Sequence, residues 1–183
     1  MDTTMKTRQL IVLAMLLAPP AVSLATIAAI AMALTSPAAR AEVPAGIAAS
    51  GEQRIAFLHA EGAQVYECKA GANGALAWTF REPVATLIEN GKTVGRHYAG
   101  PSWELADGSL VMAKVAGRAP GASAGDIPLL KLEVTDRKGG GGLAGTTTIQ
   151  RINTRGGVAE GACPTAGALL SVPYSADYAF LKK

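Results

Sequence analysis

The chain has 183 residues, of which 49% are hydrophobic, 17% are charged and only 5% are aromatic. This length corresponds to about one domain. Lysines and arginines exceed aspartates and glutamates by 17 to 14. They do not cluster, and much of the excess lies at the N-terminal end, so the composition does not indicate a nucleic-acid partner.

The first 41 residues have the composition of an export signal. Lys6 and Arg8 precede an apolar run over residues 10–34, and Ala39-Arg40-Ala41 fits a small-x-small cleavage site. We therefore expect residues 1–41 to be a signal peptide and the protein to be periplasmic or secreted. The alternative is an uncleaved membrane anchor, because the apolar run exceeds the roughly 20 residues that span a bilayer.

The remainder of the chain predicts one all-β domain. Residues 42–54 are rich in Ala, Gly and Pro without a strong period, so we interpret them as a linker before a domain over residues 55–183. Short runs of alternating or β-branched residues predict strands, and no helical period of useful length appears. The expected strands cover residues 55–60, 64–69, 76–81, 84–88, 93–99, 103–105, 110–116, 130–135, 146–153 and 169–174, followed by a terminal piece.

Tight turns separate several of these strands. Asn73-Gly74, Asn90-Gly91 and Asp107-Gly108 are favoured in two-residue hairpin loops. They indicate a meander of antiparallel strands. About eight to ten short strands with frequent turns are typical of a β-sandwich or a barrel. We expect an antiparallel β-sandwich, with a closed β-barrel as the alternative.

Two cysteines lie in the part expected to be exported. Because exported domains meet oxidising conditions, we expect a disulfide between Cys68 and Cys163. The alternatives are two free thiols or half of a metal site. Neither cysteine has a second cysteine or a histidine at ligand spacing, so we expect no metal and no cofactor.

A candidate site surrounds the Gly100-Pro101 break. His97, Glu104 and Asp107 could serve acid–base chemistry or bind a cation. A chain reversal at Gly100-Pro101 would let His97 and Glu104 face each other across a hairpin. We favour the structural interpretation, in which Asp107 forms its turn, Glu104 is a solvated strand residue and His97 bonds to backbone.

Aromatic residues suggest a second kind of site. Trp78, Tyr98 and Trp103 could form a platform for sugar rings or apolar ligands. Trp78 alternates with Leu76 and Phe80 on one face of an expected strand, so we expect it in the core. Trp103, beside a proline and a turn, fits the core and a ligand site equally well.

Common catalytic motifs are missing. The chain has no Gly-x-Ser-x-Gly elbow and no His-Glu-x-x-His helix, and its only histidines are His59 and His97. The glycine-rich run over residues 136–142 lacks the Gly-Lys-Ser/Thr ending of a phosphate loop, so we interpret it as a flexible linker.

Several short motifs occur across the expected domain. They are Gln64-Val-Tyr-Glu-Cys68, Trp78, residues 95–104, Asp107-Gly-Ser109, Ile127-Pro-Leu-Leu130, residues 149–154 with Gly156-Gly157, Cys163 and residues 172–178. Together they resemble one family of small exported bacterial and fungal proteins, domain of unknown function 3455. The resemblance covers about residues 56–180 and implies an exported domain without an established activity. Some fungal members are labelled malate dehydrogenase, but this sequence lacks the Gly-x-Gly-x-x-Gly loop that would support such an activity. Leu129 stands where the family usually has tryptophan.

We therefore expect a non-catalytic binding or structural module of the cell envelope or extracellular space. Its ligand would be a glycan or a small apolar molecule, bound by His97, Tyr98 and Trp103. The alternative is a hydrolase or lyase that uses His97 with Glu104 or Asp107. No nucleic acid is expected as a partner, and a membrane only through an uncleaved leader.

Overall fold

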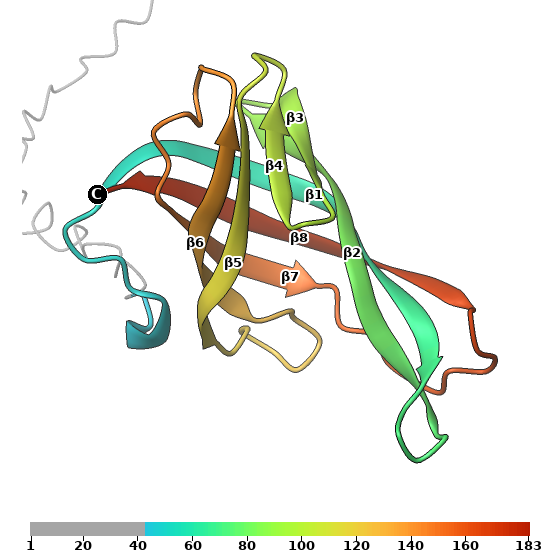
Figure 1. Ribbon diagram of the computed structural model, residues 1–183. Helices are drawn as coiled ribbons and strands as arrows, with labels where there is room; N and C mark the ends of the chain where they lie inside the picture. Colours follow the sequence, from blue (N-terminus) through green and yellow to red (C-terminus); the bar gives the residue numbers. More distant parts are fainter. Residues whose placement is uncertain (1–42) are drawn as a thin grey trace, which may run out of the picture. The chain divides into compact units, whose positions relative to one another are not determined.

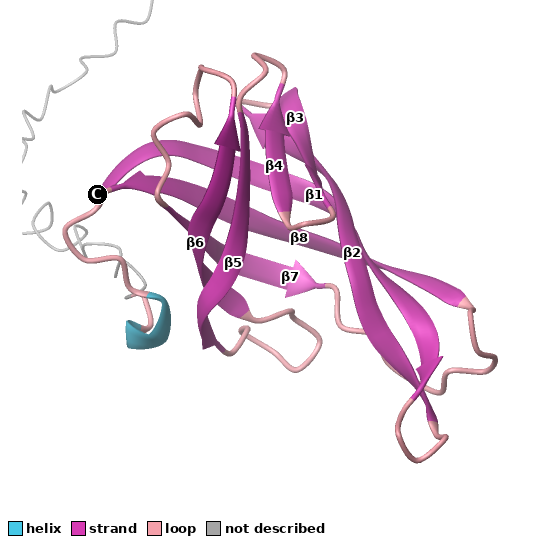
Figure 2. Cartoon of the chain, viewed as in Figure 1, coloured by secondary structure: helices cyan, strands magenta, loops and turns pink. Residues whose placement is uncertain are grey.

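The computed structural model describes residues 43–183, which form eight antiparallel strands joined by turns and loops (Figures 1 and 2). The all-β antiparallel class is confirmed. The expected signal peptide lies outside the described residues. The strands are β1 (Gln53–Ala70), β2 (Leu76–Glu89), β3 (Lys92–Tyr98), β4 (Ser102–Leu105), β5 (Leu110–Ala119), β6 (Leu129–Lys138), β7 (Thr148–Gly156) and β8 (Leu169–Lys182).

The strands form one sheet that closes on itself. Each strand pairs with its neighbour in the sequence, and β8 pairs with β1. This closed hydrogen-bonding pattern is that of a barrel, which was the alternative expectation. In Figure 1, β4, β5 and β6 also cross steeply over β1, β7 and β8, as the halves of an orthogonal sandwich do. Strand patterns alone do not separate the two arrangements, because both bury one face of each strand.

Ordered structure begins before the expected boundary at residue 55. A short 3₁₀ helix, η2 (Ala45–Ile47), contacts β5 and β6, and the Ile47 side chain is buried. Gln150 Nε2 donates to the Ile47 carbonyl at 2.6 Å, and Lys131 Nζ donates to the Ala48 carbonyl at 3.0 Å. The expected linker is therefore an N-terminal strap, because one apolar side chain and two backbone acceptors find partners on the sheet. Within residues 43–183, no helix has the length and hydrophobicity needed to cross a membrane.

Two pairs of expected strands are single strands. Residues 55–60 and 64–69 are parts of β1, and Pro83 lies inside β2 rather than ending a strand. A Cβ atom at Gly62 would collide with the Val84 carbonyl and with Ala85. Gly62 therefore permits close approach of the two strands. A bulge after Val65 absorbs the register shift near Pro83.

The start of β2 is not a core strand. Its residues 76–80 pair with β1 beyond the part of β2 that faces β3. Leu76 and Phe80 are consequently exposed and Trp78 is half-buried, which corrects the expectation that this apolar face lies in the core. This two-strand extension reaches away from the ring together with the start of β8 (Figure 1).

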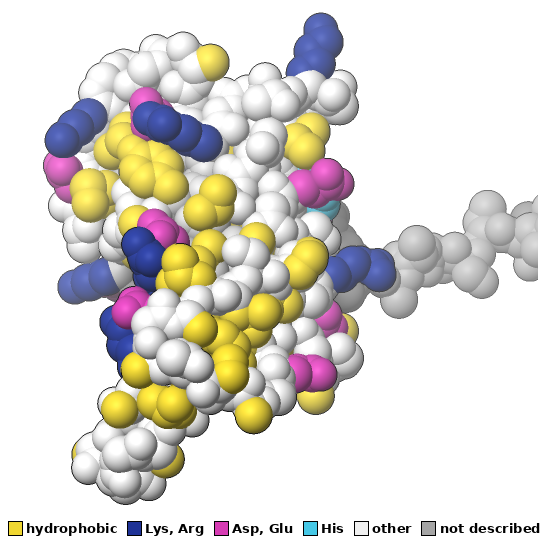
Figure 3. All heavy atoms as spheres, turned by 90° about the vertical axis from the view of Figure 1, so that its right-hand side faces the viewer, with side chains coloured by type: hydrophobic (Ala, Val, Ile, Leu, Met, Phe, Trp, Pro, Cys, Tyr) yellow, Lys and Arg dark blue, Asp and Glu magenta, His cyan; other side chains and the backbone are white. Residues whose placement is uncertain are grey.

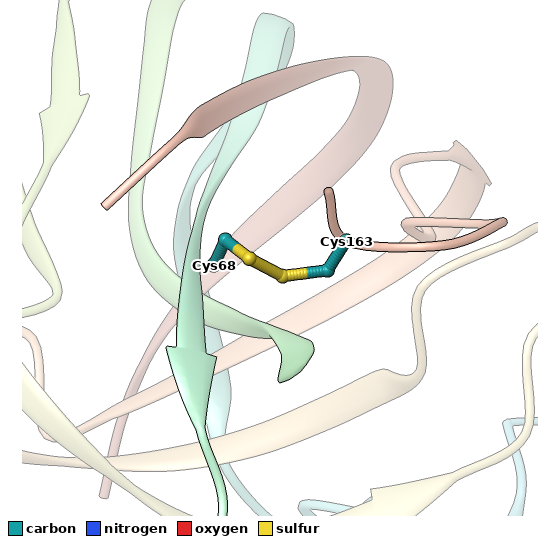
Figure 4. The surroundings of a disulfide bond; sticks show 2 residues. All are labelled: Cys68 and Cys163. Carbon is teal, nitrogen blue, oxygen red and sulfur yellow. A yellow bond between two sulfur atoms is a disulfide. The ribbon is translucent and has the colours of Figure 1, made fainter. Parts of the chain in front are cut away.

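A disulfide holds the extension to the loop before β8. Cys68 and Cys163 are bonded, as expected, although 95 positions separate them in the sequence (Figure 4). Both side chains are buried. In the chain-entropy model, closing so long a loop contributes roughly 4 kcal/mol.

The hydrophobic core lies inside the ring, where side chains of β1, β2, β4, β5, β6, β7 and β8 meet. It combines large residues with four alanines. The large members are Leu58, Leu87, Trp103, Val111, Ile127, Leu130, Leu132, Leu143, Ile149, Tyr174, Tyr178 and Phe180, and the small members are Ala60, Ala85, Ala113 and Ala176.

The close approach of β1 and β2 at Gly62 predicts that alanine destabilises the protein at this position but not at a glycine with free space around it. Gly62→Ala is expected to lower the free energy of unfolding by about 2 kcal/mol, because the new Cβ meets backbone atoms that cannot turn aside. Gly140→Ala is the matched control, since nothing lies within 4 Å of its Cβ position. Urea denaturation measures both; equal stabilities of the two variants would contradict the expected crowding.

Candidate functional site

A cavity of about 480 Å³ lies inside the ring. It opens through the side of the sheet, because β3 and β4 are much shorter than the strands beside them. β2 pairs with β3 only from Ala85 onward, and β5 pairs with β4 only as far as Met112. The rest of β2 and β5 continues past the tip of the β3–β4 hairpin (Figure 1). Residues from both of these unpaired stretches line the cavity.

The walls of the cavity are mainly apolar, and a few polar groups point into it. No aspartate or glutamate is among the lining residues of the described part of the chain. The apolar and aromatic lining comprises Tyr66, Phe80, Pro83, Pro101, Trp103, Val115, Ile127, Pro128, Leu130, Leu132 and Tyr178, and the other lining residues are Gln64, Arg81, His97, Gly100, Arg118 and Arg151.

His97 forms part of the inner wall. Its side chain is 3% exposed and stacks on Trp103, with ring centroids 4.3 Å apart. His97 Nδ1 lies 2.8 Å from the Ser102 carbonyl. Because a carbonyl only accepts, Nδ1 carries the proton and Nε2 is the acceptor nitrogen. Burial lowers the pKa of His97 to about 3, so the ring is neutral at ordinary pH.

Trp103 is a buried wall residue and not an exposed platform. It is 1% exposed and makes edge-on contacts with Tyr178 at 5.3 Å and Phe180 at 6.3 Å. Its Nε1 is buried and has no acceptor among the described residues. Trp103 thus packs in the core and also lines the cavity.

Tyr98 and Glu104 lie on the outer face, away from His97. In the β3–β4 pairing Arg96 stands opposite Glu104, whereas His97 stands opposite Trp103. Glu104 Oε2 accepts from Arg96 Nη2 at 2.8 Å and from the Tyr98 hydroxyl at 2.9 Å. The hydrogen bond from Arg96 is the main cause that lowers the pKa of Glu104. The structure therefore does not bring His97 and Glu104 together, because neighbouring positions on a strand face opposite sides.

Asp107 organises a turn. Its Oδ1 accepts from the Ser109 hydroxyl at 2.6 Å and from the Ser109 amide at 2.9 Å, and its Oδ2 accepts from the Gly142 amide at 2.8 Å. These bonds lower the pKa of Asp107, the Ser109 hydroxyl contributing most. The carboxylate thus joins its own turn to the glycine-rich loop, which was expected to be a free linker. Asp107 does not line the cavity that holds His97.

Two polar residues of the cavity were missed in the sequence. Gln64 is 2% exposed, and its buried Nε2 has no acceptor among the described residues. Arg151 donates from Nε and Nη2 to the Pro128 carbonyl at 3.1 and 2.8 Å. Each could have been found as a polar residue on an otherwise apolar strand face. Gln64 lies on the same face of its strand as Ala60, and Arg151 lies on the same face of its strand as Ile149.

The comparisons with known proteins yielded one match. A family model described as "Protein of unknown function (DUF3455)" matches residues 49–182, which span β1 to β8. No curated protein and no solved structure matches the chain significantly. Among residues 43–183, no three His, Cys, Asp or Glu side chains group in a way that could hold a metal ion.

Buried neutral His97 predicts a loss of stability in mild acid. The unfolded chain takes up this proton near pH 6.5, whereas the folded protein takes it up only near pH 3. The contribution is therefore complete above pH 6.5 and is lost as the pH falls toward 3. Between pH 7.5 and 4.5 we expect the free energy of unfolding to fall by roughly 2 to 3 kcal/mol.

His97→Gln should remove this loss, because glutamine does not titrate. Urea denaturation of both proteins at several pH values measures the difference. The exposed His59 is common to both and cancels in the comparison. Equal losses in the two proteins over this pH range would assign the acid sensitivity to other groups.

Proposed function

The chain belongs to the family described as Protein of unknown function (DUF3455), which assigns it no activity, and from the cavity we propose that it binds a small ligand with an apolar body. The observation that carries this proposal is a cavity of about 480 Å³, open at the side of the sheet, with mainly apolar walls and a few polar groups. Ligand pockets of proteins have this volume and this composition. Closed eight-stranded sheets are able to hold one small ligand in their interior.

The composition of the walls favours an apolar body over a glycan. A sugar presents hydroxyl groups all round, and each needs a polar partner when it is buried. Ile127, Leu130 and Leu132 offer none. Trp103, which could have stacked on a sugar ring at the surface, instead has its indole face against His97.

The opening suits entry of such a ligand. Phe80 is 50% exposed and Val115 is 39% exposed, and both line the cavity from the two strands that border the opening. Hydrophobic side chains also gather on the face seen in Figure 3, which is the side toward β2 in Figure 1. Apolar groups that remain exposed at the border of a cavity are typical of a binding surface.

The arrangement supports binding more than hydrolysis or elimination. A general base of the His–carboxylate kind needs a carboxylate within hydrogen-bond reach of the imidazole. His97 instead donates to a backbone carbonyl, and Glu104 and Asp107 are held by other partners.

Binding is tested with a neutral apolar probe and two tryptophan signals. N-phenyl-1-naphthylamine should move the indole N–H resonance of Trp103, which lines the cavity, and leave that of Trp78 in place. Trp78→Phe assigns the two signals. The probe should also raise the thermal midpoint. At a probe concentration a hundredfold above its dissociation constant, binding adds about 2.7 kcal/mol to the free energy of unfolding. A probe that moves neither signal nor the midpoint would contradict an interior binding site.

Export is the second part of the proposal. A basic start, an apolar run and a small-x-small site precede the domain. The buried disulfide between Cys68 and Cys163 adds support, since such bonds persist in oxidising compartments.

Expression with the complete leader in a bacterial host tests export. We expect the protein in the periplasmic or culture fraction, with the mass of oxidised residues 42–183. Ala41→Arg is the matched variant, because a large charged side chain at the cleavage site should leave the precursor uncut. Wild-type protein found intact in the membrane fraction would support an anchor instead.

A further inference from the structure

We propose that the ligand carries a carboxylate head that binds Arg151, so that the cavity takes a small amphiphilic anion. This inference rests on the binding function proposed above and adds the chemical class of the ligand. It depends on one charged side chain and on the hydrogen-bond donors that line the same cavity.

Arg151 is a cation inside the ring without an anion beside it. It follows Ile149 on the inward face of β7, and it is half-buried. Its Nε and Nη2 atoms donate to the Pro128 carbonyl, and the guanidinium also lies beside the Tyr178 hydroxyl, so its partners within the described residues are neutral. No ion pair within residues 43–183 includes Arg151. A guanidinium stays charged at any pH of interest, and a charge removed from water is costly unless it is paired.

The other unsatisfied groups of the cavity are donors as well. Gln64 Nε2 and Trp103 Nε1 are buried and have no acceptor within the described residues. A buried donor without a partner keeps its full desolvation cost. Two orphan N–H groups and a guanidinium call for a ligand that accepts several hydrogen bonds and carries negative charge. A carboxylate does both, and it matches the planar fork of arginine.

The positive charge of Arg151 affects the pKa values of three buried groups near it, Tyr174, Tyr178 and His97. Burial raises the pKa of Tyr174 and of Tyr178, and Arg151 opposes that rise. Burial lowers the pKa of His97, and Arg151 lowers it further. These three groups are therefore neutral, and none supplies the missing negative charge. An apolar lining strengthens the attraction of the site for an anion, because it screens charge weakly.

The border of the opening carries positive charge, as Arg151 does inside the cavity. Arg118 and Arg81 line the cavity on the β5 and β2 sides. Within the part of the chain that the structure describes, only Arg81 of these two has an acidic partner, Glu82 at 3.1 Å. Positive charge at the mouth of a cleft raises the local concentration of anions. The apolar body would then lie against Ile127, Leu130 and Leu132, which share the cavity with Arg151.

Matched probes that differ only in the head group test the inference. We would titrate the full chain at neutral pH with 2-naphthoate and with 2-naphthalenemethanol, and with octanoate and octanol, by calorimetry. Each carboxylate is expected to bind about 10- to 100-fold more tightly than its alcohol. Arg151→Gln should remove this preference, because it weakens binding of the carboxylate much more than binding of the alcohol. Arg155→Gln is the control, because Arg155 lies exposed on the same strand and outside the cavity.

The outcomes separate the two proposals. Equal affinities of the wild type for acid and alcohol would overturn the carboxylate assignment and leave the binding function standing. Failure of all four probes to bind would overturn the binding function itself. If Arg151→Gln does not fold, Arg151→Lys replaces it, since lysine keeps the charge and loses the fork. Its naphthoate affinity should fall about tenfold, and an unchanged affinity would overturn the role of Arg151.

Discussion

Pairing between the first and last strands is the constraint on which the rest of the structure depends. β1 and β8 run together from Gln53 opposite Lys182 to Glu67 opposite Leu169. This pairing removes both edges of the sheet and gives it an inside and an outside. In each of the remaining strands, alternate side chains then point into the enclosed space and the others point outward. A polar residue at an inward position is therefore shielded from bulk water and needs a partner inside the ring.

Unequal strand lengths leave an opening in the side of the closed sheet, through which its internal cavity meets solvent. The β3–β4 hairpin is short, whereas β2 and β5 extend beyond it. The border of the opening therefore consists of strand residues that lack a neighbour on one side, including Phe80 and Val115. The cavity thus results from the unequal lengths of neighbouring strands in a closed sheet.

Two inward residues meet the cost of burial in opposite ways. His97 gives up its charge, keeps one hydrogen bond to backbone and stacks on Trp103. Arg151 carries a guanidinium, and its partners among the described residues, the Pro128 carbonyl and the Tyr178 hydroxyl, are neutral. The first arrangement is complete within the protein, whereas the second leaves donors that an anionic ligand would satisfy. This difference makes Arg151 the more informative residue for function, although His97 is the more conspicuous one in the sequence.

Local patterns were sufficient for most strand positions and for the turns, whereas the disulfide followed from two cysteines and an expected oxidising compartment. Asn90-Gly91 and Asp107-Gly108 predicted their turns, because positive φ is needed there and few residues adopt it. The period of two along β3 also explains why His97 faces away from Arg96 and Tyr98. Patterns failed at the start of β2, where the alternation at Leu76 and Phe80 is real but the strand lies beyond the ring.

By itself, the sequence determined that this protein is an antiparallel all-β domain with one disulfide, because hairpin turns and period-two patterns act over a few residues. Only the tertiary structure decided that the ends of the sheet meet and that Gln64, Arg151 and Trp103 share one cavity. It also decided that Glu104 lies apart from His97. The physical reason is that β1 and β8 meet across more than a hundred residues of chain, and no local preference encodes which inward positions closure brings face to face.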